Sequence, residues 1–338
     1  MPSVGVRAPR RLPAAAASLA ALLALILEPS LSAASTEPSA TSPGPPARGL
    51  TDDSPLATRP GVPDASLCRS GEEGHRRATT MGDDFLKAGK TLHAEACYLG
   101  ALRYKADFPM ALYGLGEVHA RERRDALARE AYDLAVKVWP QYVDAHIALG
   151  DLHARNDRPR KAEAAYGDAV AAKPEDPMAW EALGKHQLSV KKAAAAENTY
   201  KRAALKATNG ARVPGLVLGL AKALAAQGKH GECVEHGERA SALAPAFGMA
   251  RNTVGKCKIA LGDKKGGIDA MREAARIEPD VIEHHTDLAA ALMNERNFNG
   301  AEEALEAGLK VFPGDKKLEM ARHSIGFLRA NTPRKQDL

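Results

Sequence analysis

Apolar and polar residues follow a helical period along most of the chain, and the pattern itself recurs. Within residues 146–174, Ala162, Tyr166 and Ala169 lie four and three positions apart, which places them on one face of a helix. The pair Leu149-Gly150 precedes them on a separate helical segment. This stretch therefore predicts two helices that approach closely through small side chains, with the tyrosine filling the space beside them.

The same two-helix pattern returns with a period of 34 residues. The Leu-Gly pair or its equivalent stands at Leu115-Gly116, Leu149-Gly150, Leu183-Gly184, Leu220-Ala221, Val254-Gly255 and Leu288-Ala289. Prolines close the units at Pro140, Pro174, Pro245, Pro279 and Pro313. Gly228 and Gly262 fall where a first helix must end. With an earlier unit around Gly82 and Tyr98, the repeats predict seven helical hairpins.

Residues 75–315 resemble tetratricopeptide repeats in their period, paired small residues, aromatic position and closing proline. The resemblance implies an all-α, right-handed superhelical solenoid of about seven hairpins within an array at 67–330. The units are expected to start near residues 75, 109, 143, 177, 214, 248 and 282, followed by a capping helix at 316–330 and a disordered tail at 331–338. A three-residue insertion at 208–213 should loosen or re-aim the superhelix between the fourth and fifth units.

The N-terminal region has the composition of an export signal followed by a linker. Three arginines precede a mostly apolar run at 14–27, and small residues follow at Ser32, Ala33 and Ala34. We expect residues 1–34 to be a cleaved signal peptide and the protein to be exported to the periplasm, the cell envelope or the medium. The alternative is an uncleaved membrane anchor, although the run is shorter than the roughly 20 residues that span a bilayer. Residues 35–66, rich in Pro, Ser and Thr, predict a disordered tether.

Composition and motifs favour binding over catalysis. The 47 basic and 42 acidic residues leave a net charge of +5, too balanced for a nucleic-acid-binding surface. "AGKT" at 88–91 resembles the end of a phosphate-binding loop, but Asp84 stands where that motif needs glycine. His146 and His153 are expected at packing positions held by larger aromatics in such hairpins. We predict no catalytic residues, no metal site and no cofactor; an enzyme or metal-binding protein is a remote alternative.

The resemblance implies that first helices line a concave groove that holds a peptide or helix from a protein partner. Successive first helices present one repeated position: Asp83, Glu117, Asp151, Lys185, Lys222 and Lys256. The basic half, with Asn252 adding a hydrogen bond, is expected to contact an acidic segment. The alternative is a solvated charged face. The predicted function is a non-catalytic scaffold or assembly factor in the cell envelope, with a membrane-tethered adaptor as the alternative.

The four cysteines are candidates for two disulfide bridges in an oxidising compartment. Four cysteines allow three connectivities. Cys233 and Cys257 lie on helices that should pack together, and a bridge between Cys68 and Cys97 would pin the end of the linker. We expect these two pairs; the alternative is four packed free thiols.

Overall fold

The computed structural model describes residues 63, 68 and 74–331, and the structural statements below concern these residues. The expected signal peptide, nearly all of the linker and residues 332–338 lie outside them. The α-helices are α2 (Gly74–Lys87), α3 (Thr91–Tyr104), α4 (Pro109–Arg121), α5 (Asp125–Val138), α6 (Val143–Arg155), α7 (Pro159–Ala172), α8 (Pro177–Ser189), α9 (Ala193–Lys206), α10 (Pro214–Ala225), α11 (His230–Leu243), α12 (Gly248–Ala260), α13 (Lys264–Ile277), α14 (Ile282–Asn294), α15 (Phe298–Val311) and α16 (Lys316–Asn331).

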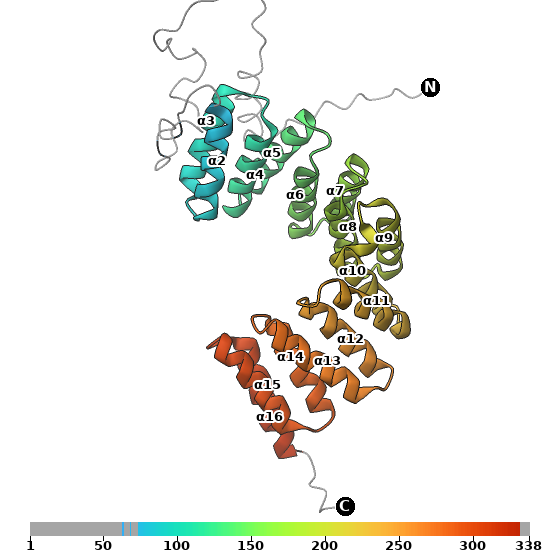
Figure 1. The fold of residues 1–338 in the computed structure, drawn as a ribbon. Helices are drawn as coiled ribbons and strands as arrows, with labels where there is room; N and C mark the ends of the chain where they lie inside the picture. Colours follow the sequence, from blue (N-terminus) through green and yellow to red (C-terminus); the bar gives the residue numbers. More distant parts are fainter. Residues whose placement is uncertain (1–62, 64–67, 69–73, 332–338) are drawn as a thin grey trace, which may run out of the picture. The chain divides into compact units, whose positions relative to one another are not determined.

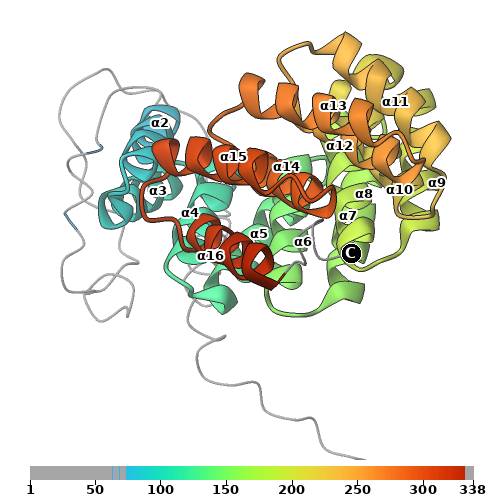
Figure 2. The same cartoon turned by 90° about the horizontal axis from the view of Figure 1, so that it is seen from below.

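The predicted all-α fold class is confirmed (Figure 1). The helices form consecutive antiparallel hairpins, from α2 with α3 to α14 with α15, and each hairpin has a first and a second helix. The chain divides into two compact units at Ala172 and Lys173. In the described residues, the first unit holds three hairpins, α2–α7, and the second holds four, α8–α15, followed by α16 (Figure 2).

A tyrosine on the second helix packs against a glycine on the first in four successive hairpins. The rings of Tyr98, Tyr132, Tyr166 and Tyr200 are all at least 96% buried, with relative exposures of 0%, 1%, 4% and 1%. A Cβ atom added to Gly150 would lie 2.5 Å from Cε1 of Tyr166, closer than any real carbon contact. The glycine on the first helix therefore leaves the space that the tyrosine ring of the same hairpin occupies.

The turn between the two helices of each hairpin contains one residue in the left-handed backbone region. Gly89, Gly228 and Gly262 have φ values of +73°, +75° and +93°. The equivalent turns of the other hairpins use non-glycine residues with φ values of 53–61°, such as Lys191 at 61°. A side chain accommodates this backbone region less easily than glycine does. The turn geometry thus repeats even where the glycine does not.

The carbonyl oxygen of the closing proline is bonded by a side chain six residues later. His146 Nε2 lies 3.0 Å from the Pro140 oxygen, and Trp180 Nε1 donates to the Pro174 oxygen at 2.7 Å. His285 Nε2 repeats the contact with Pro279 at 3.0 Å. Because a carbonyl only accepts, Nε2 of each histidine carries the proton. His146 thus occupies the position that Trp180 fills in the next hairpin, as the sequence predicted.

The insertion between the fourth and fifth hairpins is anchored to the helices around it. Gly210–Arg212 forms a turn of 3-10 helix, and the Thr208 amide donates to the Glu175 oxygen at 2.8 Å. On α9, the Glu197 carboxylate accepts from Lys229 at 2.8 Å and from Gln227 at 2.7 Å, both from the fifth hairpin. The bonds to Glu197 hold the two hairpins together where the repeat period is broken.

The cysteines are joined in the two predicted pairs. Cys68 bonds to Cys97, with Cα atoms 5.3 Å apart, and Cys233 bonds to Cys257, with Cα atoms 6.3 Å apart. All four residues are buried. In the fifth hairpin, Gly237 stands at the tyrosine position, one turn after Cys233. The second bridge therefore joins α11 to α12 beside a position that has no large side chain.

Candidate functional site

Three carboxylates occupy the same position on the first helices of the first three hairpins: Asp83 on α2, Glu117 on α4 and Asp151 on α6. Each accepts a hydrogen bond from the tyrosine of its own hairpin. Tyr98 donates to Asp83 at 2.7 Å, Tyr132 to Glu117 at 2.5 Å and Tyr166 to Asp151 at 2.5 Å. Burial first, and then the adjoining carboxylate, raises the pKa of each tyrosine. The phenols therefore remain neutral hydrogen-bond donors.

A cleft of about 580 Å³ lies beside the first two of these carboxylates, along α2 and α4 and the residue that precedes α6. It is lined by Arg76, Thr79, Thr80, Asp83, Leu86, Lys87, Phe108, Met110, Tyr113, Glu117, Arg121 and Tyr142. The rings of Tyr113 and Tyr142 are 5.3 Å apart, and Trp139 stacks on Tyr142 at 4.9 Å. Aromatics make up only 4% of the sequence, so their concentration around this cleft is distinctive.

Neighbouring carboxylates act on the two phenols of the cleft, Tyr113 and Tyr142. Burial raises the pKa of Tyr113, and Glu117 and Asp144 raise it further. Burial is also the largest cause that raises the pKa of Tyr142, and the charges of Asp144, Asp83 and Glu117 raise it further. Several carboxylates thus act on the same two phenols, which donate or accept hydrogen bonds in their neutral form.

The basic row on α8, α10 and α12 is compensated from within the protein. Lys185 pairs with Glu181 at 2.7 Å, and Lys256 pairs with Asp287 at 2.6 Å. Lys222 is half-buried, and burial followed by repulsion from Lys185 and Lys256 lowers its pKa. The three lysines therefore lie near one another, but two of them already have acidic partners.

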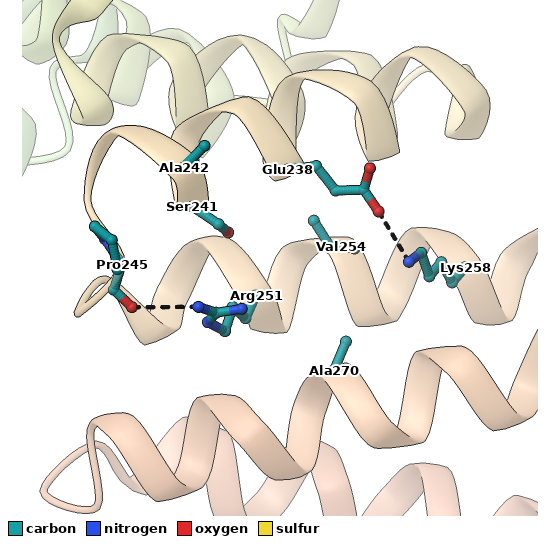
Figure 3. A pocket seen from close by; sticks show the side chains of 8 residues that line it. All are labelled: Glu238, Ser241, Ala242, Pro245, Arg251, Val254, Lys258 and Ala270. Atoms are coloured by element: carbon teal, nitrogen blue, oxygen red, sulfur yellow. Dashed lines mark hydrogen bonds and ion pairs between the residues drawn. The ribbon is translucent and has the colours of Figure 1, made fainter.

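A second, smaller hollow lies between α11 and α13, over α12, in the second unit (Figure 3). Its volume is about 400 Å³, and small side chains such as Ser241, Ala242 and Ala270 line it. Its charged groups bond within the protein: Lys258 pairs with Glu238 at 2.9 Å, as Figure 3 shows. Arg251 also lines the hollow: its Nη2 lies 3.5 Å from the Pro245 oxygen, and its buried Nε has no hydrogen-bond partner among the described residues.

Comparison with known families agrees with the hairpin geometry. Residues 79–143 and 143–186 match family models described as tetratricopeptide repeat. This chain is a tetratricopeptide repeat protein. No curated protein matches its sequence.

Several solved structures share the tetratricopeptide repeat fold. A tetratricopeptide repeat protein from Parabacteroides merdae has a TM-score of 0.57 and 13% identity, over 76% of this chain and 100% of that one. A chain of the Cut9-Hcn1 hetero-tetramer of APC/C has a TM-score of 0.54 and 15% identity, over 77% and 47% of the two chains. Pseudomonas aeruginosa pilF has a TM-score of 0.50 and 18% identity, over 62% and 94%. At such identities the likeness concerns the fold alone.

The structure differs most from expectation at Asn252, which was expected to offer a hydrogen bond to a partner. This side chain in the repeat array is only 3% exposed, and its Nδ2 donates to Asp287 at 2.6 Å. The same carboxylate oxygen of Asp287 pairs with Lys256. Asp287, on α14, therefore engages both groups because the next first helix packs beside α12.

Sequence reasoning included Asp83 and Glu117 among the groove residues but assigned no binding role to the aromatic residues beside them. Tyr113 lies four residues before Glu117 on α4, so helical spacing alone could have indicated it. Tyr142 comes from the following hairpin and carries no such signal.

Within residues 74–331, no helix is long and apolar enough to cross a membrane. The described residues also contain no group of three or more His, Cys, Asp or Glu side chains arranged to hold a metal ion.

Proposed function

We propose that this tetratricopeptide repeat protein is a non-catalytic scaffold that binds a polypeptide segment along its first helices. The observation that carries the proposal is the cleft on α2 and α4, where Tyr113, Tyr142 and Met110 are accessible in a concave site. Met110 is 43% exposed although it is a large apolar residue. Accessible aromatic and methionine side chains in a cleft are typical of protein-binding surfaces.

A polypeptide is the ligand that suits a site built by repetition. Neighbouring first helices place equivalent side chains at regular intervals, so an elongated ligand with repeated polar and side-chain groups can contact several helices at once. The phenol groups of Tyr113 and Tyr142 add hydrogen-bonding groups at the edge of the apolar surface. The family's general role in protein–protein interaction supports the same conclusion.

The proposed location is the cell envelope, with the mature protein beginning near Ser35. The sequence of residues 1–34 supports export, and two buried disulfides are compatible with an oxidising compartment. The intact mass of protein isolated from cells tests this. A mass that retains residues 1–34 would favour the membrane-tethered adaptor instead.

Site-specific photo-crosslinking in cells that naturally produce the protein tests the binding surface. A photoreactive amino acid replaces Met110 in the cleft, and a matched variant carries it at Leu205 on the second helix α9, which is 87% exposed. We expect a discrete polypeptide adduct from position 110 that is absent from position 205. No adduct from position 110, or the same adducts from both positions, would contradict binding in the cleft.

A further inference from the structure

We propose that the cleft on α2 and α4 is specific for a basic segment of a polypeptide, with a cationic side chain seated beside Tyr113 and between Asp83 and Glu117. The inference rests on the proposed function, because it names the chemistry of the segment that the scaffold binds. It reverses the sequence-based expectation of an acidic segment on the lysine row.

The carboxylate row carries charge that the protein itself does not neutralise. In the described part of the first unit, the bonds to Asp83, Glu117 and Asp151 come from neutral tyrosine hydroxyls, and no ion pair reaches these three carboxylates. Each bond uses one carboxylate oxygen, Oδ1 or Oε1. Because a carboxylate can accept at both oxygens, a cationic ligand can bind without displacing the tyrosine.

The aromatic rings add a second contact for a cation. Tyr113 stands between Tyr132 and Tyr142, at centroid distances of 5.7 Å and 5.3 Å. A ring face attracts a guanidinium or ammonium group, and the attraction is stronger where water is partly excluded. Carboxylates around half-buried phenols therefore favour a basic side chain, with arginine preferred because its planar group also stacks.

Three basic residues, Arg76, Lys87 and Arg121, also line the cleft, and in the described residues none of them forms an ion pair with Asp83 or Glu117. Arg121, in the last turn of α4, donates from Nη1 to the Leu86 carbonyl at 2.7 Å. Lys87 ends α2 and lies 3.9 Å from Asp84, with both side chains more than 70% exposed. Arg76 lies in the first turn of α2, and Lys87 and Arg121 lie in the last turns of α2 and α4, so the three cations stand near helix ends.

The lysine row is a poorer site for an acidic segment. Such a ligand would compete with Glu181 for Lys185 and with Asp287 for Lys256, at existing separations of 2.7 Å and 2.6 Å. In the carboxylate row, a basic ligand displaces no cation. This difference is why we propose a basic rather than an acidic segment as the partner.

Fluorescence anisotropy with labelled peptides tests the proposal on the full chain. The probes are short fluorescein-labelled peptides of equal length in which Arg, Glu or Gln alternates with Gly and Ser. The test variant carries Asp83→Asn, Glu117→Gln and Asp151→Asn, which remove charge and retain an oxygen acceptor for each tyrosine. The control variant removes three acidic charges from the second helices of the same unit: Glu130→Gln, Asp133→Asn and Asp168→Asn.

We expect the Arg peptide to bind the wild-type protein at low ionic strength more tightly than the Glu and Gln peptides. Loss of three exposed ion pairs should lower the affinity of the test variant for the Arg peptide about tenfold. The affinity of the control variant should change little. Tyr113→Leu should also weaken binding of the Arg peptide. Far-UV circular dichroism and thermal unfolding establish that each variant is folded.

Three results would overturn the basic-segment proposal: no binding of the Arg peptide, equal losses in the test and control variants, or preferred binding of the Glu peptide. The crosslinking experiment separates this failure from failure of the proposed function. If position 110 gives an adduct but the Arg peptide is not preferred, the scaffold function stands and the basic-segment proposal is rejected. No adduct at position 110 rejects the cleft as the binding site.

Discussion

The packing of glycine against tyrosine predicts opposite effects for the same substitution at two places in the third hairpin. At Gly150 on α6, an added Cβ would lie 2.5–2.7 Å from three ring atoms of Tyr166. At Gly167 on α7, an added Cβ would have no neighbour within 4 Å. Both residues lie inside helices, so the change in helix propensity is the same and only the space differs.

The magnitudes follow from two opposing effects. Replacing glycine by alanine inside a helix stabilises it by about 0.5–1 kcal/mol, and Gly167→Ala should show this gain. Overpacking a buried site costs about 1–3 kcal/mol, and Tyr166 is 96% buried with little room to move. Gly150→Ala should therefore lower the free energy of unfolding by about 0.5–2 kcal/mol.

Urea denaturation of the full chain, followed by far-UV circular dichroism, measures both variants. Hydrogen exchange of the amides of α6 and α7 shows whether the loss is centred on this hairpin, which matters because repeat arrays do not always unfold in one step. Gly150→Ala combined with Tyr166→Leu provides a matched rescue. It reproduces Ala289 and Leu305, which occupy the equivalent positions of the seventh hairpin.

We expect the double variant to lose less stability than the sum of the losses in Gly150→Ala and Tyr166→Leu, because leucine leaves the space that alanine needs. If Gly150→Ala stabilises the protein as Gly167→Ala does, the tyrosine ring does not restrict that site. The account of why these two residue types recur together would then be wrong.

Three further changes test the charges and the bridges. Since burial and neighbouring lysines lower the pKa of Lys222, Lys222→Met should raise the free energy of unfolding at pH 7 by roughly 1 kcal/mol; a lower value in urea denaturation would contradict this. Bonds from three side chains lower the pKa of Glu197 to about 2, so its carboxylate stabilises the fold above about pH 4 and loses this effect as the pH falls towards 2. Glu197→Gln should therefore lower the urea midpoint at pH 6 and lower it less at pH 3, and a pH-independent effect would refute the assignment. Reducing the bridge between Cys233 and Cys257, which are 24 residues apart, should cost about 3 kcal/mol in unfolding experiments; four reactive thiols in unfolded, unreduced protein would exclude both bridges.

The sequence alone determined the fold class, because each hairpin is specified by short-range spacing. Ala162, Tyr166 and Ala169 define one helix face, and Gly150 provides the space that Tyr166 fills. Every unit repeats this local rule, so the helices and their pairing within a hairpin follow without any long-range information. The confirmed array of antiparallel hairpins is the direct product of that rule.

The partners of the charged residues were decided by tertiary structure. Lys256 and Asp287 are 31 positions apart and meet only because α12 and α14 are successive first helices in contact. Likewise, Tyr113 and Tyr142 come from different hairpins and form one aromatic surface. The repeat period places a residue on a first helix, but it does not state which side chain of the neighbouring hairpin reaches it. For that reason two lysines of the row that is prominent in the sequence have acidic partners in the fold, while the carboxylate row beside the aromatic cleft forms no ion pair within the described part of the first unit.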